Sequence, residues 1–488
     1  MARNKSFGID FGTTNSSAAR YESYHFRTTG GGMTDSVVPY DEGGRPIPSV
    51  VAIDKRTGEV HTGLDAWERR AELENTCECI SSIKSVLDDE RWSKTIAGRK
   101  WTAVDVASEV FVKLRDVAKR RQADMDVATL AMPVGLKPAA RRTIRKAASY
   151  AGIRIESFVS EPTAAFFAYY DDLMSAERVL VFDWGGGTLD VSVLRHSRGR
   201  VIELATKGMK FAGDDIDLEI AERIHSFIAR EKSMQVAFED MDSRSRDALV
   251  VRSERAKRML TERGRAVVAL NRYGDEGNIR RELSVDWFEE VMSPIVNRAM
   301  GCVDLAIAQA GTTDAGIDRV LLVGGSSNLK PLRARMEERF GDRLFFPGDE
   351  GWSVSRGAAL LSYAPGAYVA AQDVSIILAD GTPYYLLREG DRVDGWHRSV
   401  EFGITDASQT LRIVFSGSTD IDEDEERLRL TEVRGYGFLE EKLILEAEVD
   451  SELVFRVRVR SNMRPGRDAK IWEYDRLKLS YGMGEWGR

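Results

Sequence analysis

Two short segments far apart in the chain share one pattern, an aspartate followed by a turn of glycines and threonines. The first reads GIDFGTTNS (residues 8–16) and the second reads FDWGGGTLD (residues 182–190). We expect each to be a turn between antiparallel strands, whose backbone N–H groups can converge on an anion. Because the same device occurs twice, the sequence predicts an internally duplicated α/β domain with its ligand between the two halves.

The aspartates of the two segments predict a metal between the halves. Asp10 and Asp183 stand at matching places, and carboxylates can hold magnesium through its water shell. Neither segment is a GxxxxGK[ST] loop or a GxGxxG fingerprint. One such turn alone is equally well explained as an ordinary tight turn. The pair favours a clamp for phosphate and metal.

Composition narrows the class of protein. The 488 residues allow roughly two to four domains, and 43% hydrophobic with 30% charged residues is typical of a globular chain. A net charge of −8 argues against nucleic acid or an anionic membrane as the main partner. The three cysteines and five histidines show no zinc-ligand spacing. With no long apolar run and no apolar leader at the N-terminus, we expect a cytoplasmic protein without a membrane span.

The hydrophobic pattern divides the chain in two. Residues 1–365 alternate short apolar strands with longer amphipathic helices, which predicts an α/β domain. Residues 374–488 lose the helical period and alternate with period two, which predicts a small β sandwich. Residues 366–373 are expected to link the two. The expected strands are 50–53, 128–132, 179–182, 191–194, 320–323, 411–415, 443–449 and 454–460; the expected helices are 103–121, 138–151, 216–231, 245–261, 285–310 and 329–340.

An acidic run, DIDEDEE (residues 420–426), stands between two of the expected strands. We interpret it as a solvated loop in preference to a cation or partner site, because runs of like charge usually face water.

Two residues between the glycine-threonine segments could take part in catalysis. Glu161 in SEPTAAFFAY precedes a proline at an expected helix start, where its carboxylate could orient or deprotonate a water. Taken alone, it is better explained as a carboxylate that complements the helix dipole. Lys84 in ISSIKSVL could hold negative charge on a terminal phosphate, although the residues alone indicate only a solvated lysine.

Two further motifs could hold a nucleoside. SERAKRML (residues 253–260) places Glu254, Lys257 and Arg258 on one helical face, which is usually a surface salt-bridge group but could bind a ribose and flank a purine. VGGSSN (residues 323–328) contains Gly324 and Gly325, which permit a base or sugar to approach the backbone. A plain strand-to-helix turn would explain the second motif equally well.

Taken together, these motifs resemble the DnaK-type heat-shock chaperones of the actin and sugar-kinase ATPase superfamily. The resemblance runs from residue 8 to about 365, and more weakly through the β domain. It rests on GIDFGTTNS, PSVVAI (48–53), LAMP (130–133), SEPTAAFFAY, FDWGGGTLD, AGDDID (212–217), SERAKRML and VLLVGGSS, all in family order.

The resemblance implies ATP or ADP with Mg²⁺ as ligands, with K⁺ as a further candidate ion, and it assigns roles by position. The catalytic set is Lys84, Glu161, Thr13, Asp183 and Thr188. The metal set is Asp10, Asp183 through water, and Asp190 in the ion and water network. The nucleotide set is Gly12, Thr13, Thr14, Asn15, Gly185, Gly186, Gly187, Thr188, Gly213, Glu254, Lys257, Arg258, Thr261, Gly324, Gly325, Ser326, Asn328 and Asp349.

Several positions depart from the family pattern. Asn328 replaces an arginine that stacks on adenine, which predicts weaker base discrimination. Ser157 replaces an arginine used by the J-domain partner. The acidic, leucine-rich linker is absent, the segment after Lys84 is short, and no helical lid is expected after the sandwich. These differences predict altered coupling between the domains.

The resulting reading is a lidless DnaK-like chaperone, an ATPase with slow turnover, whose β domain holds or releases a polypeptide. A J-domain co-chaperone and a nucleotide-exchange factor are the implied partners. Two alternatives remain open at this point. One is a regulatory or assembly module with one fixed protein partner, and the other is a small-molecule kinase of the same superfamily.

Overall fold

The structure is a computed structural model, and it describes residues 7–24, 34–73, 75–197, 199–348, 351–363, 365–403, 410–416, 424–429, 442–462 and 470–482. The chain forms two compact units. The first unit comprises residues 1–134, 143–195 and 204–363. The second comprises residues 364–488 with two short segments from earlier in the chain, 135–142 and 196–203. The domain boundaries at 365 and 373 stay a prediction beside this division.

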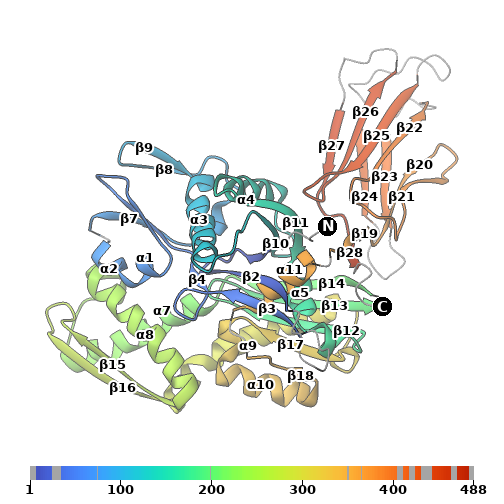
Figure 1. Cartoon of the computed structure of the whole chain (residues 1–488). Helices are drawn as coiled ribbons and strands as arrows, with labels where there is room; N and C mark the ends of the chain where they lie inside the picture. Colours follow the sequence, from blue (N-terminus) through green and yellow to red (C-terminus); the bar gives the residue numbers. More distant parts are fainter. Residues whose placement is uncertain are drawn as a thin grey trace. The chain divides into compact units, whose positions relative to one another are not determined.

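The first unit contains two sheets that repeat one topology (Figure 1). In each, an antiparallel hairpin continues through a parallel strand to a second parallel strand at the edge. One sheet has the order β11 (Arg154–Ser160), β10 (Val127–Met132), β1 (Phe7–Asp10), β2 (Asn15–Tyr24) and β3 (Thr34–Tyr40), with β4 (Ile47–Pro48) on β2. The other begins with β18 (Leu344–Phe345), β17 (Arg319–Val323), β12 (Arg178–Trp184), β13 (Leu189–Ser197) and β14 (Arg200–Met209), and residues 196–203 of β13 and β14 belong to the second unit. The predicted duplication is therefore confirmed.

Both glycine-threonine segments are hairpin turns, as predicted. Asp10 pairs with Ser17 across the β1–β2 hairpin, and Asp183 pairs with Asp190 across the β12–β13 hairpin. Each aspartate is the last or next-to-last residue of a buried strand. The strand therefore delivers the carboxylate and the turn at the same end of its sheet.

The expected helices of the first unit are also present. Thr102 caps α3. Its hydroxyl accepts a hydrogen bond from the Asp105 N–H, and the Asp105 carboxylate accepts one from the Thr102 N–H, which is a capping box. Figure 1 shows α8 beside α7 and leading into the β15–β16 hairpin. The helices are α3 (Ala103–Arg120), α4 (Pro138–Tyr150), α5 (Glu161–Ala168), α7 (Gly213–Lys232), α8 (Ser243–Arg263), α9 (Val285–Gln309), α10 (Lys330–Phe340) and α11 (Ser353–Tyr363), and the hairpin strands are β15 (Arg265–Asn271) and β16 (Asn278–Ser284).

A smaller subdomain precedes α3. It holds the sheet β6 (Val60–Thr62), β5 (Val51–Asp54) and β7 (Cys77–Ile80), the hairpin β8 (Ser93–Ile96) and β9 (Arg99–Thr102), and the short helices α1 (Leu64–Glu68) and α2 (Arg70–Leu73).

Helix α9 is the one helix of the described residues that is long and apolar enough to cross a membrane. It also carries much of the core of the first unit, since Phe288, Val291, Met292 and Val303 are buried in the main hydrophobic cluster. We therefore interpret α9 as a core helix.

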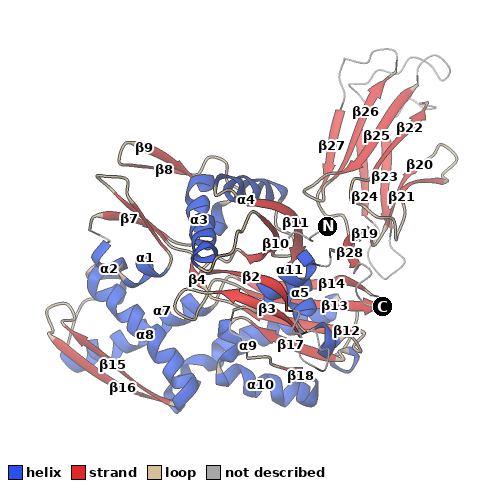
Figure 2. Ribbon diagram, in the orientation of Figure 1, coloured by secondary structure: helices blue, strands red, loops and turns tan. Residues whose placement is uncertain are grey.

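The second unit contains the predicted β sandwich (Figure 2). Its two four-stranded sheets enclose one core, in which Phe415 stacks on Tyr474 with ring centroids 3.8 Å apart. One sheet has the order β21 (Pro383–Leu387), β20 (Asp373–Ile377), β23 (Thr410–Ser416) and β24 (Asp424–Arg429). The other has the order β22 (His397–Phe402), β25 (Leu443–Val449), β26 (Phe455–Ser461) and β27 (Lys470–Tyr474).

The loop expected over the acidic run at residues 420–426 was wrong for its last three residues. The last three residues of the acidic run, Asp424 to Glu426, lie in β24 and pair with Phe415 to Ile413 of β23. The backbone N–H and C=O groups of an adjacent strand offer hydrogen bonds that outweigh the weak strand propensity of acidic residues. Residues 420–423 lie outside the described part of the chain.

Candidate functional site

A cavity of about 630 Å³ opens between the two hairpin turns of the first unit. Its walls come from both repeated sheets, from the starts of α5, α7 and α11, and from the short 3₁₀ helix η4 (Gly325–Asn328). Of the predicted site residues, the described ones all line this cavity; Asp349 lies outside the described part of the chain. The sequence motifs therefore converge on one place.

The two turns touch each other inside the cavity. A Cβ added to Gly186 would lie 2.4 Å from the Thr14 hydroxyl oxygen, and one added to Gly187 would lie 3.0 Å from Thr13 Cβ. The Thr14 hydroxyl itself donates to Asp214 at the start of α7, at 2.7 Å. The bare glycines of the second turn thus make room for the threonines of the first.

Lys84 and Glu161 form an ion pair at the base of the cavity. Lys84 lies in η1 (Ile83–Val86), and its Nζ is 2.8 Å from Glu161 Oε1. Glu161 is the first residue of α5, which Ser160 caps by accepting from the Thr163 N–H. Both charged side chains are about nine-tenths buried. Burial would lower the pKa of Lys84, but Glu161 and Asp10 outweigh it and raise the pKa.

Three aspartates crowd the same space. Burial is the main cause that raises the pKa of Asp10 to about 7, and the charge of Glu161 adds to it while Lys84 opposes it. Burial likewise raises the pKa of Asp183 well above its ordinary value, with Glu161, Asp10 and Asp190 contributing. Burial and then the charge of Glu161 raise the pKa of Asp190 to about 6, although a hydrogen bond from Thr188 lowers it. These buried carboxylates lack enough positive charge to balance them.

Such a group of oxygen donors fits magnesium. Hard cations prefer carboxylate and water oxygens, and magnesium usually keeps several of its waters. Over the part of the chain that the structure describes, no three Asp, Glu, His or Cys side chains are placed to hold an ion directly. Contact of Asp183 with magnesium through water stays a prediction.

The nucleoside side of the cavity is built by α7, α8 and η4 (Gly325–Asn328). Lys257 donates to the Gly213 carbonyl at 2.7 Å and pairs with Asp217 at 2.8 Å. Arg258 pairs with Glu254 at 2.8 Å along α8. The Ser326 hydroxyl donates to the Gly185 carbonyl at 2.8 Å, which joins this wall to the second turn.

Gly324 shows why a glycine follows β17. Its φ is +81°, and a Cβ there would lie 2.5 Å from Asp183 Oδ1. Only glycine combines this conformation with that approach. The VGGSSN motif is therefore packed against the predicted metal-binding carboxylate.

Sequence reasoning missed several residues that line the cavity. Asp214 and Asp217 stand inside the AGDDID motif, whose acidic side chains were a usable signal. Arg45, Trp67 and Trp352 belong to no motif and had no such signal. Trp67 lies under the Arg70 guanidinium, 3.8 Å from the ring centroid, and α1 and α2 place both residues.

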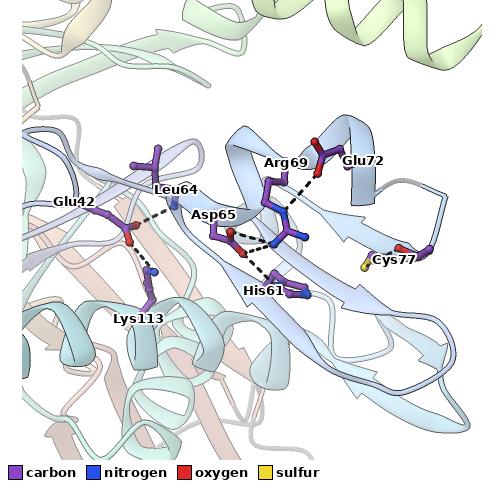
Figure 3. Close-up of polar contacts among 9 residues, drawn as sticks. Glu42, His61, Leu64, Asp65, Arg69, Glu72, Cys77 and Lys113 are labelled. Carbon is purple, nitrogen blue, oxygen red and sulfur yellow. Dashed lines mark hydrogen bonds and ion pairs between the residues drawn. The ribbon is translucent and has the colours of Figure 1, made fainter.

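The start of α1, which carries Trp67, is fixed by a buried ion pair (Figure 3). The Glu42 carboxylate accepts from the Leu64 N–H at 2.9 Å and pairs with Lys113 of α3 at 2.7 Å. Asp65 on the same helix contacts His61 and Arg69. The contacts from α3 thus hold this wall of the cavity in place.

Comparisons with known proteins agree with this geometry. The family model described as Hsp70 protein matches residues 6–414. The chaperone protein DnaK of two strains of Halobacterium salinarum is 30% identical over 392 residues, which cover 79% of this chain and 59% of the relative. The chain thus spans less than two thirds of the length of these curated relatives.

The repeated lobes followed by a β sandwich are the fold that the resemblance implies, and this fold class is confirmed. The family model covers most of the chain, and the family motifs meet in one cavity. The chain therefore belongs to the Hsp70 protein family.

Proposed function

We propose that the first unit binds ATP or ADP with magnesium and hydrolyses ATP slowly, and that the second unit holds a polypeptide segment according to the nucleotide state. The observation that carries the proposal is the buried Lys84–Glu161 pair, which lies in the same cavity as both turns. We infer that a protein with this activity acts as a chaperone in the cytoplasm.

The roles of the residues follow from their surroundings. The carboxylate of Glu161 orients the attacking water and accepts its proton. The ammonium group of Lys84 and the hydroxyl of Thr13 hold the negative charge that grows on the terminal phosphate. Backbone N–H groups of residues 12–15 and 185–188 cradle the other phosphates.

Magnesium, when bound, supplies positive charge against the phosphates. Asp10 and Asp183 would hold its water shell, and Asp190 with Thr188 would order the neighbouring waters and a candidate K⁺. The raised pKa values of Asp10 and Asp190 support this role, because a bound cation would stabilise the ionised carboxylates against the burial and the Glu161 charge that raise those values.

The nucleoside would lie along α8 and η4. Glu254 and Lys257 would contact the ribose, and Arg258 would cover one face of the base. Asn328 lines the same cavity and offers an amide where a guanidinium plane would stack. We therefore expect the base to be held less selectively.

Calorimetry and single-turnover hydrolysis on the full chain test the nucleotide part. We expect magnesium-dependent binding of ATP followed by slow release of phosphate. Two outcomes would contradict the proposal. One is that the chain binds ATP equally well with and without magnesium, and the other is that it phosphorylates a small acceptor faster than it hydrolyses ATP. The second outcome would support a small-molecule kinase.

The polypeptide part needs a separate test. Fluorescent unfolded peptides should bind the full chain weakly and exchange quickly, with an off-rate that differs between ATP and ADP. Equal off-rates in both states would contradict coupling.

A second candidate function is a module with one fixed protein partner. It is favoured by the expected linker, because residues 367–370 within it form a strand, β19 (Ala367–Ala370). A pull-down from the native host separates the two: one stoichiometric partner supports the module, and a range of unfolded clients supports the chaperone.

A J-domain co-chaperone and an exchange factor remain proposed partners. Ser157 lies in β11, and its hydroxyl is hydrogen-bonded to the Thr129 hydroxyl at 2.9 Å. Because serine does not offer the positive charge of the arginine that it replaces, we expect weak stimulation of hydrolysis by a J-domain partner. A J-domain protein that accelerates hydrolysis strongly would contradict this expectation.

A further inference from the structure

The strand β28 (Leu479–Gly482) is paired along both of its edges within the second unit. On one edge Leu479 to Gly482 pair with all four residues of β19. On the other edge Ser480 to Gly482 pair with Ile202 to Arg200, the first residues of β14. A four-residue strand near the end of the chain thus lies between two strands that come from much earlier.

The segment that contains β19 is also held along its second edge. We call residues 366–371 the connector. The Ala370 N–H donates to the Asp391 carbonyl at 2.8 Å, and the Ala370 carbonyl accepts from the Gly390 N–H at 2.7 Å. The Val393 N–H donates to the Tyr368 carbonyl at 3.1 Å. Polar groups of the connector backbone are therefore bound on both sides.

Tyr481 adds side-chain contacts to this pairing. The Gly366 N–H donates to the Tyr481 hydroxyl at 2.9 Å. The Tyr481 ring meets Tyr368 edge to face, with centroids 5.1 Å apart, and only 6% of the Tyr481 surface is exposed. A Cβ on Gly366 would lie 2.1 Å from the Gly482 carbonyl and 2.5 Å from the Tyr481 ring.

We propose that β28 is a clasp strand that keeps the connector paired in every nucleotide state. The connector then does not alternate between a paired and a free form. This reading rests on the proposed function only in taking nucleotide binding as the signal. The pairing itself needs no ligand.

The physical reason is the cooperativity of a central strand. Releasing the connector requires its backbone to leave both β28 and residues 390–393, and the freed polar groups must then find other partners. Regions held in this way open rarely and protect their amides from hydrogen exchange. The connector should therefore exchange slowly, unlike a free linker.

Hydrogen exchange with mass spectrometry on the full chain tests the proposal. We expect peptides that cover residues 366–371 to be protected without nucleotide, and to the same degree within about twofold with ADP and with ATP. Fast exchange without nucleotide, or a change of more than about twofold between ADP and ATP, would overturn the clasp. If nucleotide fails to bind at all, the nucleotide-free protection still decides the matter.

Two variants test whether β28 is the cause of that protection. Tyr481→Ala removes the ring and hydroxyl that cover the connector, and Ile471→Ala truncates an apolar side chain on β27 that is 61% exposed. We expect exchange of the connector to rise at least tenfold in Tyr481→Ala alone. Equal exchange in the two variants would overturn the proposal.

A backbone variant sharpens the result. Ser480→Pro places proline in a central strand, which proline rarely tolerates. It should free the connector while ATP binding in the first unit stays within a few-fold of wild type. Continued protection of the connector would show that β28 does not hold it. If this variant does not fold, Tyr481→Phe gives the same decision, because loss of the hydroxyl should raise exchange at Gly366 and leave residues 390–393 unchanged.

Discussion

The two hairpin turns of the cavity occupy equivalent places, yet they contribute different chemistry. The first turn offers the side chains of Thr13 and Thr14, whereas the second offers three glycines in succession. The Thr14 hydroxyl occupies the space that a Cβ on Gly186 would need. A duplicated fold has thus become asymmetric at its centre. One half provides hydroxyls and the other provides exposed backbone and the room for those hydroxyls.

The largest expected effect on the rate of ATP hydrolysis comes from the Lys84–Glu161 ion pair, which lies in the same cavity as both turns. We expect Lys84→Ala and Glu161→Ala each to slow hydrolysis by roughly 10²- to 10⁴-fold, since they act on charge and water in the transition state. Thr13→Ala should act in the same direction. ATP affinity should stay within a few-fold of wild type. Single-turnover hydrolysis and calorimetry check this, and a variant that loses binding and hydrolysis equally has another role.

The next prediction tests the fit of the two turns. Gly186→Ala should weaken ADP binding by about tenfold or more, because its Cβ collides with Thr14. Gly185→Ala is the matched control, since the nearest atom to its Cβ is the Thr188 carbonyl oxygen at 3.8 Å. Thr14→Gly removes the clashing atoms and should rescue Gly186→Ala. Calorimetry with ADP decides, and equal losses at Gly185 and Gly186 would break the comparison.

One buried carboxylate from each repeated half, Asp10 and Asp190, predicts that the stability of the folded protein depends on pH. The pKa of Asp10 is about 7 and that of Asp190 about 6, both raised mainly by burial from an ordinary value of 3.8. The folded state therefore binds these protons more tightly than the unfolded state. Their contribution to stability is complete below about pH 4 and is lost as the pH rises through 6 to 7.

We expect the melting temperature of the nucleotide-free protein to fall across this window, and Asp10→Asn to make the fall shallower. Thermal melts from pH 5 to 8 measure it. Asp380→Asn is the control, since hydrogen bonds from Thr382 lower the pKa of Asp380 and it does not titrate there. A wild-type slope retained in Asp10→Asn would contradict the assignment.

The smallest effect concerns the base. Asn328→Arg would add a guanidinium plane beside the nucleoside and should tighten ADP by a fraction of a kcal/mol up to about 2 kcal/mol. Asn328→Gln changes length without adding a cation and should leave affinity unchanged. Competition of ATP against GTP measures the gain in selectivity. If Arg258 already covers the base in a complex, the substitution will have no effect.

The sequence allowed most of the cavity to be predicted, because its chemistry lies in short local motifs. Asp10, Glu161, Asp183 and Lys257 were named from such motifs, and the structure brings them together. Trp67 was not predicted, because an isolated tryptophan on a short helix carries no signal of what it faces.

The clasp strand shows the opposite case. Leu479 to Gly482 is too short for a clear alternating pattern, and its partners at Arg200 and Ala367 lie far away in the chain. Long-range strand pairing depends on backbone groups that every residue has. The pattern of side chains therefore does not predict it. The same reason explains the wrong expectation for Asp424 to Glu426. Their local charge could not reveal that they pair with β23.

The central claim is that the two unlike turns hold one magnesium between them, and a double-mutant cycle on Asp10 and Asp183 tests it most directly. ATP binding is measured by calorimetry with and without magnesium in wild type, Asp10→Asn, Asp183→Asn and the double variant. We predict that magnesium strengthens ATP binding in wild type, that each single variant loses this gain, and that the double variant loses no more than either one. Full retention of the magnesium effect in either single variant, or losses that simply add, would contradict a shared ion.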